Sequence, residues 1–348
     1  MHIDKIIKGF FLLFTLIISS FCYPALTYSR NASSYSLMNL TETVHEGNLL
    51  VSNNETLLIE NTKYHLIGDL IIKDTAKVII KNSIFNQTSS TRINIFVFNN
   101  SRLVIENSKF IAESENPAKI FVSGNSVVEI TNSTLVNSKC RIWIWTYNKA
   151  HVYMDSSIIE SPEDSEIITD DESKAYVKNS SLGRLVLWGN SFISAQYVTL
   201  LNTEFSGVAI FNNSTFEAVH LETNYIRADE GHKVTIRNSK INSWIRAGDN
   251  VELWFTRSSA PELSAGGEAK VWLIDSSVGH IEEYGNATVL VGWEVPVLGV
   301  IAFHYTIAGI ARILLIAIGV TAVLLIIVVT YILWKRRKRR ELKRRKKI

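Results

Sequence analysis

Between residues 57 and 278 the chain repeats one short pattern of hydrophobic and polar positions. The pattern is apolar, any residue, apolar, any residue, Asn, two residues of any kind, then apolar, and its first copy is Leu57-x-Ile59-x-Asn61-x-x-Tyr64. Further copies begin at Val78, Leu103, Val128, Val152, Ala175 and Val198, and weaker copies begin at Val234, Leu253 and Val271. Successive copies begin 18 to 25 residues apart, with one interval of 36. A period of this length is typical of a solenoid, in which each repeat forms one coil.

Within each copy the alternation of apolar residues predicts a β-strand with one buried face. Most inward positions hold Val or Ile, which favour a packed, pleated surface. A second apolar stretch precedes many copies and ends in a turn at Asn or Gly, for example Ile95–Val97 before Asn99 and Leu185–Leu187 before Gly189. Asn and Gly tolerate the left-handed backbone of a sharp turn. The sequence therefore predicts about ten coils, each of two or three short strands.

The recurring asparagine predicts a polar ladder at one corner of the solenoid. If the copies stack in register, each side-chain amide lies next to the equivalent amide of the following coil and bonds to it. The members of this predicted ladder are Asn61, Asn82, Asn107, Asn132, Asn179, Asn202 and Asn238. Ser156 takes the same place in one copy.

Residues 54–290 resemble the right-handed parallel β-helix of the pectin-lyase-like superfamily, in coil period and strand–turn pattern but in no family motif. A leucine-rich repeat has a similar period. That repeat has Leu at most inward positions and two residues before its Asn, whereas one residue intervenes here. The resemblance implies an all-β solenoid. The superfamily includes polysaccharide lyases and hydrolases, phage tailspikes, adhesins and non-catalytic surface proteins, so it does not select a function.

The two ends of the chain predict its topology. Residues 1–29 have two lysines, an apolar run and a small-residue end, which is typical of a secretory signal peptide; the alternative is an uncleaved anchor. Residues 313–334 are long and apolar enough for a transmembrane helix. Residues 335–348 are strongly basic, which places them in the cytoplasm by the positive-inside rule. We therefore expect a single-pass cell-membrane protein, with a lead-in or cap over 30–50, the β-helix over 51–290 and a juxtamembrane segment over 291–312, all outside.

The net charge of +3 misrepresents the part outside the membrane. The basic tail holds 11 of the 36 Lys and Arg residues; without it and the leader, 23 basic and 31 acidic residues remain, a balance near −8. An acidic solenoid argues against a nucleic-acid partner, and a basic tail next to a membrane span fits contact with anionic lipid.

Aromatic residues gather on the strand that precedes the repeated phrase, and they are candidates for glycan contact. If Ile142 and Ile144 point inward, their neighbours face solvent, whereas a one-residue change of register buries them in the core. The candidates are Trp143, Trp145, Tyr147 and Trp188.

An acidic stretch within residues 160–172 is a second candidate site. Carboxylates this dense have the chemistry to bind Ca²⁺ or to hydrolyse a glycosidic bond, although a charged, solvated loop explains them equally. The candidates are Glu166, Asp170, Asp171 and Glu172. Thr169-Asp170-Asp171 and Gly231-His232 also resemble fragments of the polygalacturonase site, but the Asn-Thr-Asp element is missing and no Arg-Ile-Lys follows His232. We assign no catalytic residue and no metal ligand.

Glycosylation sequons occur along the whole part outside the membrane. Ladder positions such as Asn132 would be buried, so Asn31, Asn39 and Asn286 are the candidate modified sites.

Taken together, the sequence favours a membrane-anchored surface protein that presents a non-catalytic interaction surface to glycans, cell wall or other proteins. A tethered polysaccharide lyase or glycoside hydrolase and a structural spacer are the alternatives.

Overall fold

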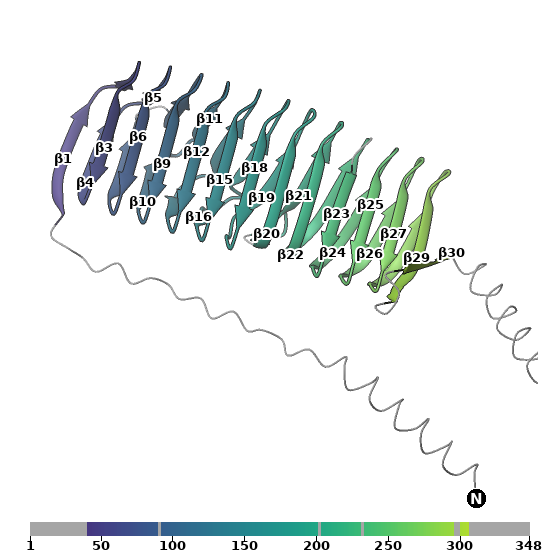
Figure 1. Ribbon diagram of the computed structural model, residues 1–348. Coiled ribbons are helices and arrows are strands. Elements are labelled where there is room, and N and C mark those ends of the chain that lie inside the picture. The colour runs from purple at the N-terminus through teal and green to yellow at the C-terminus, as the bar shows by residue number, and fades with distance from the viewer. Residues whose placement is uncertain (1–39, 90–91, 201–202, 231–232, 296–299, 306–348) are drawn as a thin grey trace, which may run out of the picture. The chain divides into compact units, whose positions relative to one another are not determined.

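The computed structural model of the chain describes residues 40–89, 92–200, 203–230, 233–295 and 300–305. The described chain winds into an all-β solenoid with three faces (Figure 1). Each strand pairs in parallel with the strand that occupies the same face of the next coil. Twelve coils follow one another in this way, so the prediction of a parallel β-solenoid is confirmed.

The strands are listed here by face. The first face begins with β1 (Thr41–Glu46), β4 (Thr62–Ile67), β7 (Ile84–Thr88), β10 (Lys109–Glu113), β13 (Thr134–Asn137) and β16 (Ile158–Glu160). The second face begins with β2 (Leu49–Val51), β5 (Leu70–Ile72), β8 (Asn94–Val97), β11 (Ala118–Val122), β14 (Ile142–Thr146), β17 (Glu166–Thr169), β19 (Arg184–Leu187) and β21 (Gly207–Phe211). The third face contains β3 (Thr56–Glu60), β6 (Lys77–Lys81), β9 (Arg102–Glu106), β12 (Val127–Thr131), β15 (His151–Asp155), β18 (Lys174–Lys178), β23 (Lys233–Arg237), β25 (Glu252–Thr256), β27 (Lys270–Ile274) and β29 (Thr288–Val295).

Later strands bend through a corner and serve two or three faces. These are β20 (Phe192–Leu200), β22 (Thr215–Asp229), β24 (Lys240–Ala247), β26 (Ser259–Ala265) and β28 (Ser277–Glu283). A last strand, β30 (Val300–Tyr305), pairs with β29 in the antiparallel direction.

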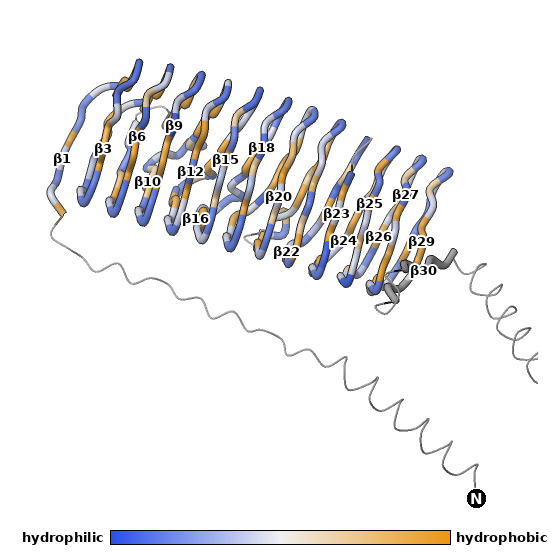
Figure 2. Tube along the Cα trace, viewed as in Figure 1, coloured by the Kyte–Doolittle hydropathy of each residue, from blue (hydrophilic) through white to orange (hydrophobic). Residues whose placement is uncertain are grey.

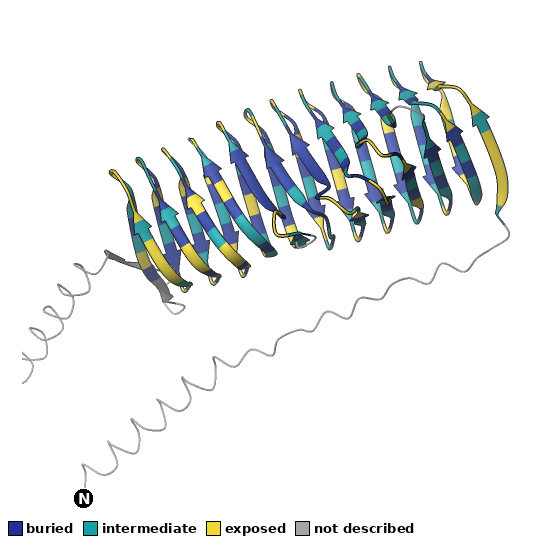
Figure 3. Ribbon diagram, turned by 180° about the vertical axis from the view of Figure 1, so that it is seen from behind, coloured by how far each residue is buried: buried dark blue, intermediate teal, exposed yellow. Residues whose placement is uncertain are grey.

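The core is a column of stacked apolar side chains that runs through all coils. Inward positions on every face are buried, and the same hydropathy pattern recurs from coil to coil (Figures 2 and 3). On the first face Tyr64, Phe85 and Phe110 stack on one another, with ring centroids 5.6 and 5.9 Å apart. The repeated phrase thus provides one set of buried contacts per coil, and neighbouring coils bury each other's edges.

The repeated asparagine marks the corner between the third and first faces. Asn61, Asn82, Asn107 and Asn238 all have φ between 47° and 51° there. Ser156 has the same conformation. Asparagine is enriched at this position because it reaches the left-handed region at a lower cost than most residues.

The polar ladder at this corner runs mainly through the residue after the asparagine, which differs from the predicted amide ladder. The serine at that place accepts the backbone N–H of its counterpart one coil earlier at 3.0 to 3.2 Å and donates to the carbonyl two residues before itself. One asparagine amide, that of Asn179, donates instead to Asp155. Serine suits this role because a hydroxyl donates and accepts at once. The members are Ser83, Ser108, Ser133, Ser157, Ser180, Ser239, Ser258 and Ser276.

The predicted register was wrong for one copy and missed one coil. The corner that follows Asn179 is Tyr197, with φ 55°, and the next is His220, with φ 56°. The copy starting at Val198 therefore lies beyond its corner, and Asn202 itself is outside the described residues. The interval of 36 residues is no insertion, because β22 supplies an additional coil there. With the last coil at β29, the total becomes twelve rather than about ten.

Within the part of the chain that the structure describes, no helix is long and apolar enough to cross a membrane. The predicted transmembrane segment, 313–334, lies outside that part.

Candidate functional site: an apolar row and a groove beside the second face

The outward side chains of the second face include an unbroken apolar row. One outward position is apolar on eight consecutive coils, and it changes to Arg227 and Arg246 on the next two. Because outward positions of a soluble sheet are usually polar, this row is not explained by the core. The members of the apolar row are Leu50, Ile71, Phe96, Phe121, Trp145, Ile168, Val186 and Ala209.

Trp143 and Trp145 point away from the core, because Ile142 and Ile144 between them are fully buried. Rings on neighbouring coils then stack: Phe96 on Phe121 with centroids 5.5 Å apart, and Phe121 on Trp145 at 6.2 Å. Centroids as close as 5.5 Å require overlapping faces, so these rings turn their edges outward.

The other predicted aromatics lie near the corner between the second and third faces. Tyr147 is half-buried, and Trp188 is 39% exposed. Trp188 stacks on Phe211 of the next coil at 4.1 Å. Phe211 and Trp145 also pack against the outer cluster of Ile168, Val186 and Ala209. All four predicted aromatics thus belong to one outer surface.

The corner between the first and second faces carries the loops that differ most between coils. Loops at 161–165 and 201–206 enclose the much tighter corner of the coil between them, at Leu182 and Gly183. A groove of about 530 Å³ opens at this place. Its walls are Pro162, Glu163, Asp164, Thr203, Glu204 and Phe205, and its remaining lining residues are Arg141, Arg184 and Tyr225.

A buried carboxylate ties the two loops together across the short coil. Asp164 is 8% exposed, and its two oxygens accept hydrogen bonds from the hydroxyls of Thr203 and Ser206, both at 2.7 Å. Asn224 adds a hydrogen bond from its amide to the carbonyl of Thr203 at 2.6 Å. A Cβ at Gly183 would approach the Cα of Asp164 to 2.8 Å, so glycine lets the loop cross directly above it. The groove walls are therefore held in place by the protein itself.

The floor of the groove is a row of polar side chains on successive coils. Glu166 accepts a hydrogen bond from Arg184 at 3.0 Å and lies 4.0 Å from Arg141. A Cβ on Gly207 would lie 2.6 Å from ring carbons of Tyr225, so the absence of a side chain there lets the Tyr225 ring lie over that strand, towards Arg184. On its other face Tyr225 stacks with Trp244, with centroids 4.9 Å apart.

Burial dominates the electrostatics of this floor. It raises the pKa of Glu166 above its ordinary value, although the guanidinium groups of Arg184 and Arg141 act in the opposite direction. Burial also raises the pKa of Tyr225, against the hydrogen bond and charge of Arg184. The Nε–H of Arg184 is buried and has no partner among the described residues. The groove thus contains a donor that a ligand oxygen can satisfy.

The predicted acidic site is not one cluster. Glu166 lies at the groove, whereas Asp170, Asp171 and Glu172 lie at the opposite end of β17, at the corner between the second and third faces. There Asp170 accepts the backbone N–H of Asp171 at 2.7 Å, and Glu172 lies 3.8 Å from Lys149. The described residues contain no group of three side chains able to hold a metal ion, so Ca²⁺ is not carried further. The other half of the polygalacturonase fragment, His232, lies outside the described residues.

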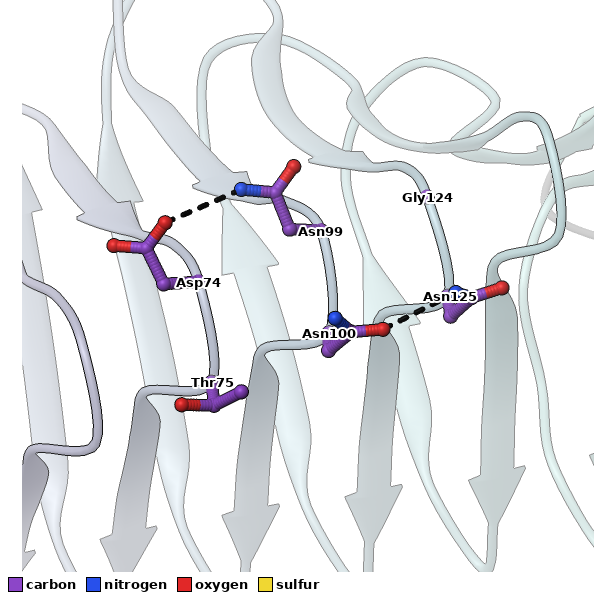
Figure 4. A pocket seen from close by; sticks show the side chains of 6 residues that line it. All are labelled: Asp74, Thr75, Asn99, Asn100, Gly124 and Asn125. Atoms are coloured by element: carbon purple, nitrogen blue, oxygen red, sulfur yellow. Dashed lines mark hydrogen bonds between the residues drawn. The ribbon is translucent and has the colours of Figure 1, made fainter.

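A second recess lies at the same corner on earlier coils, and its polar groups already bond to one another (Figure 4). The amide of Asn99 donates to Asp74 at 3.4 Å, and that of Asn125 donates to Asn100 at 3.1 Å. The bonds run from coil to coil as in the serine ladder. They explain these residues as a corner structure without a ligand.

Of the predicted glycosylation sites, Asn286 is exposed at this corner, and Asn31 and Asn39 lie outside the described residues. Sequence reasoning also missed most of the groove, including Arg141, Arg184, Phe205 and Tyr225. The usable signal was the fall in coil length from 23 residues before Asn179 to 18 after it, measured between left-handed corners.

Comparisons with known proteins add little to this geometry. No family model matches the chain, and no curated protein matches its sequence. Among solved structures, the periplasmic alginate epimerase AlgG aligns with 70% of this chain and 77% of its own, at 12% identity and a TM-score of 0.34. A likeness this distant supports no conclusion about function, and membership of the pectin-lyase-like superfamily stays a prediction.

Proposed function

We propose that this chain is a membrane-anchored cell-surface protein whose solenoid binds a glycan chain, without catalysis, along the second face. The observation that carries the proposal is the apolar row, which continues over eight coils outside the core. At about 4.8 Å per coil the row is about 34 Å long. A surface of this length suits an extended ligand that runs parallel to the solenoid axis.

The width of the row favours a glycan over a globular protein. Charged side chains border it, with Lys119, Glu166 and Arg184 on one side and Asp170 on the other. A sugar chain has apolar C–H surfaces and hydroxyl-bearing edges, so it matches a narrow apolar row between polar flanks. A stable protein interface requires a broader contact, of about 800 Å² on each partner.

The location in the proposal comes from the chain ends. A leader over 1–29, an apolar stretch over 313–334 and a basic tail over 335–348 favour an outside solenoid on a single membrane span. An outside location would bring the apolar row to cell-wall or surface glycans. Protease treatment of intact cells tests it: the solenoid should be digested and a tag after residue 348 protected, and the reverse pattern would contradict the topology.

Binding is tested with the purified full-length chain in detergent on an array of oligosaccharides, reading both retention and released products. Retention without cleavage is expected. Trp145→Ala should weaken it about tenfold, because the row loses its largest central contact. Tyr153→Ala is the matched control, since Tyr153 is an exposed aromatic of the third face. Released products would overturn the non-catalytic assignment, and an absence of retention would overturn glycan binding.

A further inference from the structure

We infer that the groove beside the apolar row binds one neutral sugar unit of the glycan and thereby selects the ligand. This inference rests on the proposed function and adds the class of sugar. The groove adjoins the row directly, because Arg184 on its floor and Val186 in the row belong to the same strand, β19. A chain lying along the row can therefore place a unit or a branch in the groove.

The groove is already shaped for a ligand. Its walls are joined by the bonds from Thr203 and Ser206 to Asp164, so the loops need no ordering when a ligand binds. Phe205, on one wall, is 67% exposed, the largest exposure among the large hydrophobic side chains described. An exposed ring at a polar groove gives a sugar an apolar contact without disturbing the core.

The polar groups in the groove alternate as donors and acceptors. Arg184 pairs with Glu166 at 3.0 Å, and Arg141 pairs with Glu163 at 2.7 Å. A guanidinium donates only and a carboxylate accepts only, so each pair can engage two neighbouring hydroxyls of a sugar in both roles. The unpartnered Nε–H of Arg184 provides one more donor.

The charge of the groove decides between classes of sugar. Arg141 and Arg184 contribute two positive charges, and they face the carboxyl groups of Glu163, Asp164, Glu166 and Glu204. Both arginines are engaged by carboxylates, so no free cation remains in the groove for a uronate, sulfate or phosphate. A negative groove repels such groups, and hydroxyls pair with both members of each ion pair. The geometry therefore points to an uncharged sugar.

The experiment compares matched neutral, acidic and amino oligosaccharides on the full-length chain in detergent, with variants of the groove and of the row. Phe205→Ala should weaken binding of the neutral ligand about tenfold, and it should leave folding unchanged because the ring is exposed. Arg184→Gln should also weaken it about tenfold by removing donors from the floor. Tyr153→Ala is again the control. A circular dichroism melt of each variant separates lost binding from lost folding.

The outcomes separate this inference from the proposed function. Neutral binding that falls with Phe205→Ala and with Trp145→Ala supports both. Binding that falls with Trp145→Ala and is untouched by Phe205→Ala overturns the groove alone. A preference for acidic or amino oligosaccharides also overturns the groove inference. Binding that none of these variants changes overturns the groove and the apolar row together.

Discussion

The two halves of the solenoid share two corners and differ at the third. From Asn61 to Asn179, successive left-handed corner residues are 21 to 25 residues apart. From His220 onwards they are 18 or 19 apart. The serine ladder between the third and first faces continues in both halves, at Ser83–Ser180 and again at Ser239–Ser276. The residues saved in the second half come from the corner between the first and second faces, where β22, β24, β26 and β28 run through without a loop.

The groove forms where the two coil lengths alternate. The coil that contains Gly183 is short, whereas the coils before and after it have loops at this corner. The two loops therefore meet across the short coil through Asp164. A uniform run of long or short coils would stack its corners evenly and leave no such gap. In this solenoid, variation in coil length builds a site that no single coil encodes.

The largest effect is expected when the link between the two loops is removed. Asp164→Ala leaves the hydroxyls of Thr203 and Ser206 without their acceptor, which should lower the free energy of unfolding by about 3 kcal/mol. Thermal denaturation followed by circular dichroism measures this loss. The control is Glu163→Ala in the same loop, whose partner is the partly exposed Arg141 and which should cost below about 1 kcal/mol. Equal effects of the two variants would show that Asp164 does not join the loops.

The second effect tests how closely the long coil overlies the short one. Gly183→Ala places a Cβ 2.8 Å from backbone atoms of Asp164 and Ser165, so the loop must shift, at a cost of about 2 kcal/mol. Gly266→Ala, in the second half, is the control because a Cβ there meets nothing within 4 Å. The same melts measure both. If both variants melt like the unmodified chain, the loop does not lie on the short corner.

The third effect should be the same in both halves, since the ladder does not depend on coil length. Ser108→Ala removes the acceptor of the Ser83 N–H, and Ser258→Ala removes that of the Ser239 N–H. A buried N–H without a partner costs about 1 kcal/mol or more. The fall in melting temperature should therefore be similar for the two variants. A clear difference between them would mean that the two halves differ at more than one corner.

Local alternation was enough to predict the solenoid, because each coil repeats its own inward positions. The outward direction of Trp143 and Trp145 followed from the same alternation once the register was known. The corners at Tyr197 and His220 escaped because the pattern was recognised by asparagine, and any residue can adopt this φ if stacking compensates; these two rings stack at 4.5 Å. The groove escaped for another reason. Its bonds join residues 39 and 42 positions apart across a whole coil, so they depend on relative loop lengths rather than on any local pattern.

The smallest predicted effect concerns the groove floor and the dependence of stability on pH. The pKa of Glu166 is raised in the folded chain, chiefly by burial, so the folded state binds its proton more tightly than the unfolded state. Stability from this group is therefore present below the unfolded pKa and is lost as the pH rises through the raised folded value. Glu166→Gln removes this dependence. Melting temperatures measured from pH 4 to pH 7 should fall more for the unmodified chain than for the variant, once the carboxyl groups common to both are subtracted. The opposite sign would mean that Arg184 and Arg141 outweigh burial, and that the floor of the groove is held as a strong ion pair.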